Sequence, residues 1–167
     1  MTSRILVAYV SRKGSTAEIA QAVGKELISA GHTVDVAEAK TVRTVEGYSA
    51  VVIGAPMYMG SIDGEAGKFV KRFSEHLAHL PVAAFAVGMA PASHDAKKVE
   101  ESMKALSASL APLTPVATTM FAGRLDPTKL SFIQRKMTEF VKSPTGDFRD
   151  WNAIAAWARE LPKKMGV

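Results

Sequence analysis

Apolar runs alternate with amphipathic segments along almost the whole chain. Strands covered on both faces are apolar at successive positions, which predicts strands at 5–10, 50–54 and 82–87. A short segment with a β-branched core, 33–37, and the segment 116–121 are predicted to be two further strands. Apolar positions three and four residues apart predict helices at 17–30, at 65–79, after a cap at Ser93 or Asp95, and within 147–165. Helices that alternate with buried strands indicate an α/β protein with a doubly wound parallel sheet and helices on both faces.

The composition limits the function classes. A length of 167 residues suits a single domain spanning 1–167, and the chain holds no cysteine, which excludes disulfides, thiolate metal sites and cysteine nucleophiles. Met1 to Arg4 lead straight into a six-residue apolar run, too short for the core of a signal peptide, and no apolar run approaches the length of a membrane span. We therefore expect a cytoplasmic protein.

The turn after the first predicted strand carries the strongest local signal. It consists of Ser11, Arg12, Lys13, Gly14, Ser15 and Thr16. A helix begins directly afterwards, and its unpaired first-turn N–H groups and dipole favour an anion such as phosphate. The turn lacks the spacing of an ATP-binding P-loop and the three glycines of a dinucleotide site. An ordinary capped turn without a ligand stays a possible interpretation of these residues.

Two further loops leave strand carboxyl ends, where open α/β sheets bind their ligands. The first, 55–62, contains Pro56, Met57, Tyr58, Met59 and Gly60; the second, 88–95, contains Gly88, Met89, Ala90, Pro91 and Ala92. Met and Tyr side chains suit the face of a flat ring, and a small, backbone-rich loop suits hydrogen bonds to a ring edge. A flat heteroaromatic ring with one phosphate is flavin mononucleotide (FMN). The alternative is that the Met-Tyr-Met loop only closes over the core.

No side chain is predicted to act as a catalytic acid or base, and no metal site is predicted. His94 beside Asp95 resembles a base with an orienting acid, but an exposed helix start capped by Asp95 is the preferred interpretation. The other three histidines form no cluster with ligand spacing. Trp151 and Trp157 are expected to face the core from the last helix.

Residues 124–146 interrupt the alternation of strands and helices. Apolar side chains recur there at helical spacing among five basic and two acidic residues, and this segment holds over half of the net charge of +5. A basic amphipathic helix can lie on an anionic membrane surface or receive a partner. The alternative is a helix packed on its own domain with a solvated basic face. Nucleic-acid binding is not predicted, because no basic strand carries interleaved aromatic residues.

With the three loops in place, nearly the whole chain resembles the flavodoxin-like family. Its phosphate loop has the usual form Thr-x-Thr-Gly-x-Thr, which Gly14 and Thr16 match, with Ser11 in place of the first threonine and Lys13 in place of the second. The resemblance implies five parallel strands in the order 2-1-3-4-5 with FMN at their carboxyl edge. It assigns the 11–16 turn to the phosphate and the 56–58 and 88–92 segments to the flavin.

Short motifs are similar to the branch of this family that includes the quinone-dependent protoporphyrinogen oxidase of bacteria. They lie at 52–55, 69–71, 121–125 and 150–151, and a basic insertion follows the third. The resemblance implies an FMN-dependent oxidoreductase with a quinone or a redox protein as partner and peripheral contact with the inner membrane face through 124–146. Two alternatives stay open, a flavodoxin that only carries electrons and a flavin-free phosphate-binding or regulatory domain. The oligomeric state is left open.

Overall fold

The computed structural model describes residues 3–125 and 146–167 and confirms the predicted parallel sheet. The five main strands are β1 Arg4–Tyr9, β2 Thr33–Glu38, β3 Ala50–Tyr58, β5 Val82–Gly88 and β6 Ala117–Ala122. They run parallel in the spatial order β2-β1-β3-β5-β6. The two-residue strand β4 (Ser61–Ile62) only pairs back onto β3, so the main strands follow the expected order 2-1-3-4-5.

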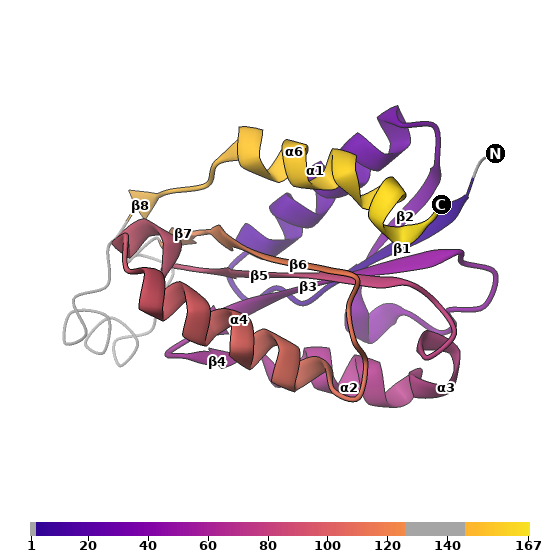
Figure 1. Ribbon diagram of the computed structural model, residues 1–167, viewed down its shortest axis with the longest axis horizontal. Helices are drawn as coiled ribbons and strands as arrows, with labels where there is room; N and C mark the ends of the chain where they lie inside the picture. Colours follow the sequence, from indigo (N-terminus) through magenta and orange to yellow (C-terminus); the bar gives the residue numbers. More distant parts are fainter. Residues whose placement is uncertain (1–2, 126–145) are drawn as a thin grey trace.

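Helices cover both faces of this sheet (Figure 1). One face carries α1 (Ser15–Ser29) and α6 (Trp151–Met165), and the other carries α2 (Gly64–Arg72), α3 (Ser74–Leu77) and α4 (Ala96–Leu110). Short 3₁₀ turns at Ala39–Thr41 (η1) and Pro91–Ser93 (η2) follow β2 and β5. The doubly wound architecture is therefore as predicted.

Alternate residues of the strands build two separate cores. On β1, Ile5 and Val7 pack with the α1 and α6 side, whereas Leu6 and Ala8 pack with the α2 and α4 side. All four are at most 1% exposed. The continuous apolar run of this strand is thus explained by burial on both faces.

The strand β3 extends further than the sequence indicated, because we expected a loop from residue 55. Ala55 and Pro56 stay in register with β5, and Met57 and Tyr58 pair with β4. Pro56 is tolerated because it lies past Gly54, the last β3 residue that pairs with β1, so no β1 carbonyl lacks a donor through its missing N–H. Its carbonyl accepts a hydrogen bond from the Asp63 backbone N–H at 3.0 Å. The expected loop is therefore a strand that ends in a tight hairpin.

Two expectations about helices were wrong. The predicted helix 65–79 divides at Phe73, where the backbone leaves helical geometry between α2 and α3, although Phe73 and Leu77 are buried as expected. Trp151 does not face the core, because it is 45% exposed at the first position of α6. Trp157 does pack inward, with its ring 5.9 Å from that of Phe85.

The predicted insertion begins and ends in a small antiparallel ribbon. Its strands are β7 (Arg124–Leu125) and β8 (Gly146–Asp147), and they lie at the end of the sheet where α4 begins (Figure 1). The basic amphipathic helix expected within 124–146 rests on residues 126–145, which lie outside the described residues.

Candidate functional site

The turn after β1 has the geometry of an anion-binding loop. Gly14 is the N-cap of α1 and has a φ of 90°, a left-handed conformation that favours glycine. Its backbone N–H donates to the Ser11 hydroxyl at 3.1 Å and closes the turn. Ser15 and Thr16 then open the helix, and both are buried. The loop thus brings the start of α1 to the carboxyl end of β1.

The start of α1 differs from the starts of the other long helices. Asp63, Asp95 and Asp150 cap α2, α4 and α6 by accepting hydrogen bonds from first-turn N–H groups. Among the described residues, no side chain caps α1. Its first-turn N–H groups therefore keep their capacity to bind an anion, and no carboxylate occupies the cap.

The hairpin after β3 places two large side chains beside this turn. Met59 and Gly60 form its two-residue tip, with φ values of 52° and 80°, as in a type I′ turn. Tyr58 is 41% exposed and Met59 58% exposed, whereas Met57 is buried. Only Tyr58 and Met59 of the Met-Tyr-Met segment therefore present their side chains to solvent.

The segment after β5 approaches the same edge through its backbone. A Cβ atom on Gly88 would lie 2.9 Å from Met120 Cε and 3.4 Å from Met57 Cβ, so this position is closely packed. Beyond it, the Ser93 hydroxyl donates to the Ala90 carbonyl at 2.6 Å and shapes the 3₁₀ turn η2. The predicted segment 88–92 is therefore compact, and it approaches this edge mainly through its backbone atoms.

Hydrogen bonds and an ion pair join these loops. Arg12 Nε lies 2.6 Å from Asp63 Oδ2, which links the 11–16 turn to the start of α2. The Arg124 backbone N–H donates to Ser15 Oγ at 3.2 Å, and the Gly123 N–H donates to the Gly88 carbonyl at 3.1 Å. The carboxyl ends of β1, β3, β5 and β6 are therefore held as one edge.

Contacts between ionisable side chains at this edge shift their pKa values. The hydrogen bond from Arg12 lowers the pKa of Asp63, and the same contact raises the pKa of Arg12. Burial raises the pKa of Tyr58, with a further contribution from the Asp63 carboxylate. Tyr58 therefore keeps its phenol proton at neutral pH, and the Arg12 side chain is directed to Asp63.

The sequence patterns did not identify the group of residues around Arg149. This side chain is 7% exposed, its Nη2 lies 2.7 Å from Asp147 Oδ2, and its Nη1 pairs with Glu18 in the first turn of α1. Its guanidinium carbon also lies 4.7 Å from the centre of the Trp151 ring. The Asp-x-Arg spacing was a local signal, but the contact with Glu18 spans 131 residues of sequence.

This cluster predicts an acid-sensitive contribution to stability. The hydrogen bonds from Arg149 lower the pKa of Asp147 from 3.8 to about 2. A carboxyl with a lowered folded-state pKa stabilises the fold above its unfolded pKa and loses that contribution as pH falls toward the folded value. Asp147→Asn should therefore flatten the decline of unfolding free energy between pH 4 and pH 2, measured by urea titration. An unchanged slope would contradict this assignment.

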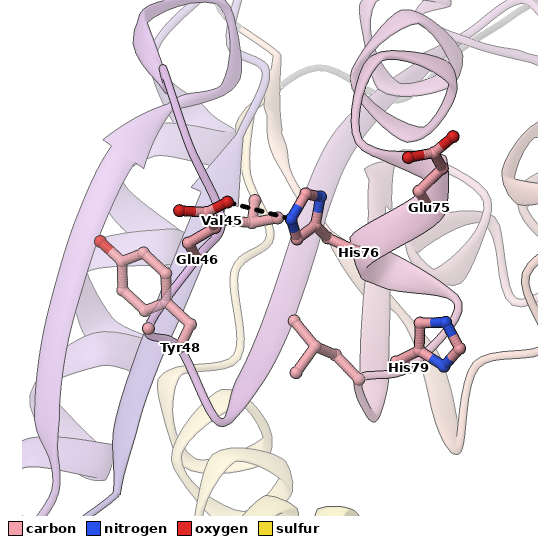
Figure 2. A pocket seen from close by; sticks show the side chains of 8 residues that line it. Val45, Glu46, Tyr48, Glu75, His76 and His79 are labelled. Carbon is pink, nitrogen blue, oxygen red and sulfur yellow. Dashed lines mark ion pairs between the residues drawn. The ribbon is translucent and has the colours of Figure 1, made fainter.

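A separate cavity of about 470 Å³ lies at the opposite edge of the sheet. It is lined by residues that precede β3 and β5, among them Glu46, His76 and His79. Figure 2 shows His76 directed toward Glu46, at 3.3 Å, while His79 and Glu75 point elsewhere. Within 3–125 and 146–167, no three His, Asp or Glu side chains come close enough to one another to hold a metal ion. The cavity has no part in the carboxyl-edge site.

Comparison with known proteins agrees with this architecture. The fold and the position of the site define a flavodoxin-like α/β protein. A family model described as the flavodoxin domain matches residues 6–152, and the chain belongs to this family. In the part of the chain that the structure describes, no helix is both long and apolar enough to cross a membrane.

Three known proteins are similar to this chain in sequence or in fold. It is 25% identical to protoporphyrinogen IX dehydrogenase [quinone] of Escherichia coli K12, over 95% of this chain and 94% of that protein. A short-chain flavodoxin associated with a bacterial microcompartment has a TM-score of 0.61 at 15% identity, with 99% of each chain covered. A Fusobacterium nucleatum flavodoxin bound to flavin mononucleotide has a TM-score of 0.52 at 15% identity, with 72% and 68% covered.

Proposed function

We propose that this chain binds FMN at the carboxyl edge of its sheet and uses it for oxidation and reduction. The observation that carries the proposal is the start of α1, which has a glycine at its N-cap and no side-chain cap among the described residues. A phosphate monoester suits this group of N–H donors. The identity of the cofactor is supported by the family and by the FMN-bound flavodoxin to which the chain is similar.

Three segments would hold the cofactor. The phosphate would be bound by backbone N–H groups of the 11–16 turn and by the hydroxyls of Ser15 and Thr16. The ring would lie between the exposed side chains of Tyr58 and Met59 and the backbone of residues 88–92. Bound FMN supplies the capacity to accept and donate electrons, and the chain positions it and excludes water from one side. Arg12 would act indirectly, because its guanidinium is paired with Asp63. The Ser11 hydroxyl accepts the Gly14 N–H and, like that of Ser15, keeps a proton that it would donate to the phosphate.

The test is reconstitution of the purified protein with FMN. We expect a visible flavin absorbance that stays with the protein through gel filtration, and quenching of flavin fluorescence on binding. Riboflavin, which has the same ring without the phosphate, should bind more weakly. A protein that cannot be loaded with FMN under either oxidising or reducing conditions would leave only the flavin-free interpretation.

We infer further that the chain is a quinone-linked oxidoreductase. Support comes from the 25% identity to a quinone-dependent protoporphyrinogen dehydrogenase over almost the full length of both chains. The flavodoxin-like neighbours support the second candidate, an electron carrier without a substrate of its own. Oxidation of protoporphyrinogen IX that depends on added quinone and on bound FMN would select the first; reduction only by a partner reductase would select the second.

A further inference from the structure

Three hydrogen bonds and one ring contact hold the guanidinium of Arg149, whose side chain is 7% exposed. Asp147 receives its Nε at 2.9 Å and its Nη2 at 2.7 Å, in the two-pronged geometry that fixes the plane of an arginine. The guanidinium carbon lies over the Trp151 ring, 4.7 Å from its centre. The remaining edge is directed to Glu18, so Asp147 and Trp151 orient the contact that Arg149 makes with α1.

Glu18 stands where its charge matters for a bound anion. It lies in the first turn of α1, immediately after Ser15, Thr16 and Ala17. A carboxylate in this turn is favoured by the helix dipole, and it competes with any phosphate that uses the same dipole. The two negative groups would also repel one another.

We propose that Arg149 is a positioning residue for phosphate binding at the 11–16 turn, where it offsets the charge of Glu18. The inference rests on the proposed function, because it concerns the phosphate of the cofactor. Three of the five N–H groups of Arg149 donate to Asp147 and Glu18, so these two carboxylates set the orientation of the guanidinium. It acts through Glu18 and makes the start of α1 less negative.

Arg149 also stands in the segment that braces the phosphate loop. The backbone N–H of Phe148, which precedes Arg149, donates to the Gly123 carbonyl at 3.1 Å. Arg124 follows Gly123, and its backbone N–H donates to Ser15 Oγ. Loss of Arg149 could therefore loosen the site as a whole as well as change its charge. The two effects separate when ligands with and without a phosphate are compared.

The experiment measures dissociation constants of FMN and riboflavin for wild type and Arg149→Gln by quenching of flavin fluorescence. We expect FMN to bind about tenfold more weakly to the variant, because a like charge is uncovered near a phosphate in a partly screened site. Riboflavin binding should change by less than about twofold, since its ring carries no phosphate. Equal losses for the two ligands would overturn the proposal in favour of a purely structural role.

Charge balance supplies a second and independent readout. Glu18→Gln should tighten FMN binding several-fold, and the double variant Glu18→Gln/Arg149→Gln should return to within about twofold of wild type. An unchanged FMN affinity in Glu18→Gln would overturn the proposal even if Arg149→Gln failed to fold. The matched control is Arg159→Gln, which breaks the 3.0 Å pair between Arg159 and Glu26 of α1, far from its first turn. It should leave the affinity for both ligands unchanged.

Inorganic phosphate separates this inference from the proposed function. At matched ionic strength, phosphate should raise the thermal midpoint of the apo wild type more than that of Arg149→Gln. If phosphate raises the midpoint of wild type more than that of Arg149→Gln but wild type does not bind FMN, the cofactor assignment fails and the role of Arg149 stands. If wild type binds FMN and all variants keep the same preference for FMN over riboflavin, the role of Arg149 fails alone. If neither FMN nor phosphate binds, both fail.

Discussion

Gly54→Ala is expected to be the most destabilising single-methyl change at the centre of the sheet. Gly54 lies in β3 between Tyr9 of β1 and Phe85 of β5. An added Cβ would lie 2.1 Å from Phe85 Cζ, well inside van der Waals contact. Phe85 is fully buried, and its ring is packed against Phe121 at 5.7 Å and Trp157 at 5.9 Å. Two neighbouring aromatic rings therefore confine the Phe85 ring.

Overpacking of this kind costs about 3 kcal/mol of unfolding free energy. For a chain of this length, that corresponds to a fall of about 10 °C in Tm. Thermal unfolding followed by circular dichroism measures the change. The double variant Gly54→Ala/Phe85→Leu should recover part of the loss, because the smaller side chain leaves room for the new methyl group.

Gly67→Ala provides the matched control for this substitution. Gly67 lies in α2, and a Cβ there would meet only the Ser109 carbonyl, at 3.5 Å. Alanine in a helix is favoured over glycine by about 0.5–1 kcal/mol, so this variant should be slightly more stable than wild type. Equal losses from the two substitutions would show that the close contact with Phe85 is not the cause.

The fold could be predicted because its signals are local. The strands β1, β3 and β5 are apolar runs, the outer strands β2 and β6 carry β-branched residues, and each long helix has its own periodicity. The alternation and the doubly wound sheet therefore follow from the sequence alone. The end of β3 could not be predicted in this way. Pro56 is typical of a loop, and the hairpin tip places Met59 at a positive φ that methionine seldom signals. The break at Phe73 carries no glycine or proline either.

The candidate site was likewise predictable only where its residues are close together in the sequence. The 11–16 turn is a continuous segment, so its shape at the start of a helix could be inferred from six residues. The pairs that assemble the edge could not, because Arg12 reaches Asp63 and Arg149 reaches Glu18 across long stretches of sequence. The exposure of Trp151 was mispredicted for a related reason: periodicity gives the face of a helix but does not show that its first residue stays partly exposed and contacts Arg149.

Ser15→Asp is expected to abolish most FMN binding while leaving the protein folded. Ser15 is the first residue of α1, and its hydroxyl already accepts the Arg124 N–H, an interaction that a carboxylate can replace. Aspartate is also favoured in the first turn of a helix, by about 0.5 kcal/mol. The new charge would then occupy the position proposed for the phosphate.

The size of the effect follows from Coulomb's law. Two like charges about 4 Å apart repel by about 4 kcal/mol at an effective dielectric constant of about 20, and rearrangement and salt reduce this value. A loss of about 100-fold in FMN affinity is therefore a conservative expectation, since each factor of ten corresponds to about 1.4 kcal/mol. Fluorescence titration of the apo protein measures it directly.

Ser15→Asn isolates the charge, because asparagine has nearly the shape of aspartate without its negative charge. The asparagine variant should bind FMN far more tightly than the aspartate variant, while riboflavin should bind the two about equally. The aspartate variant should also be at least as stable as the asparagine variant, so its loss of FMN binding cannot arise from unfolding. If the two variants bound FMN equally, the phosphate could not lie at the start of α1, and the 11–16 turn would be an ordinary connection between strand and helix.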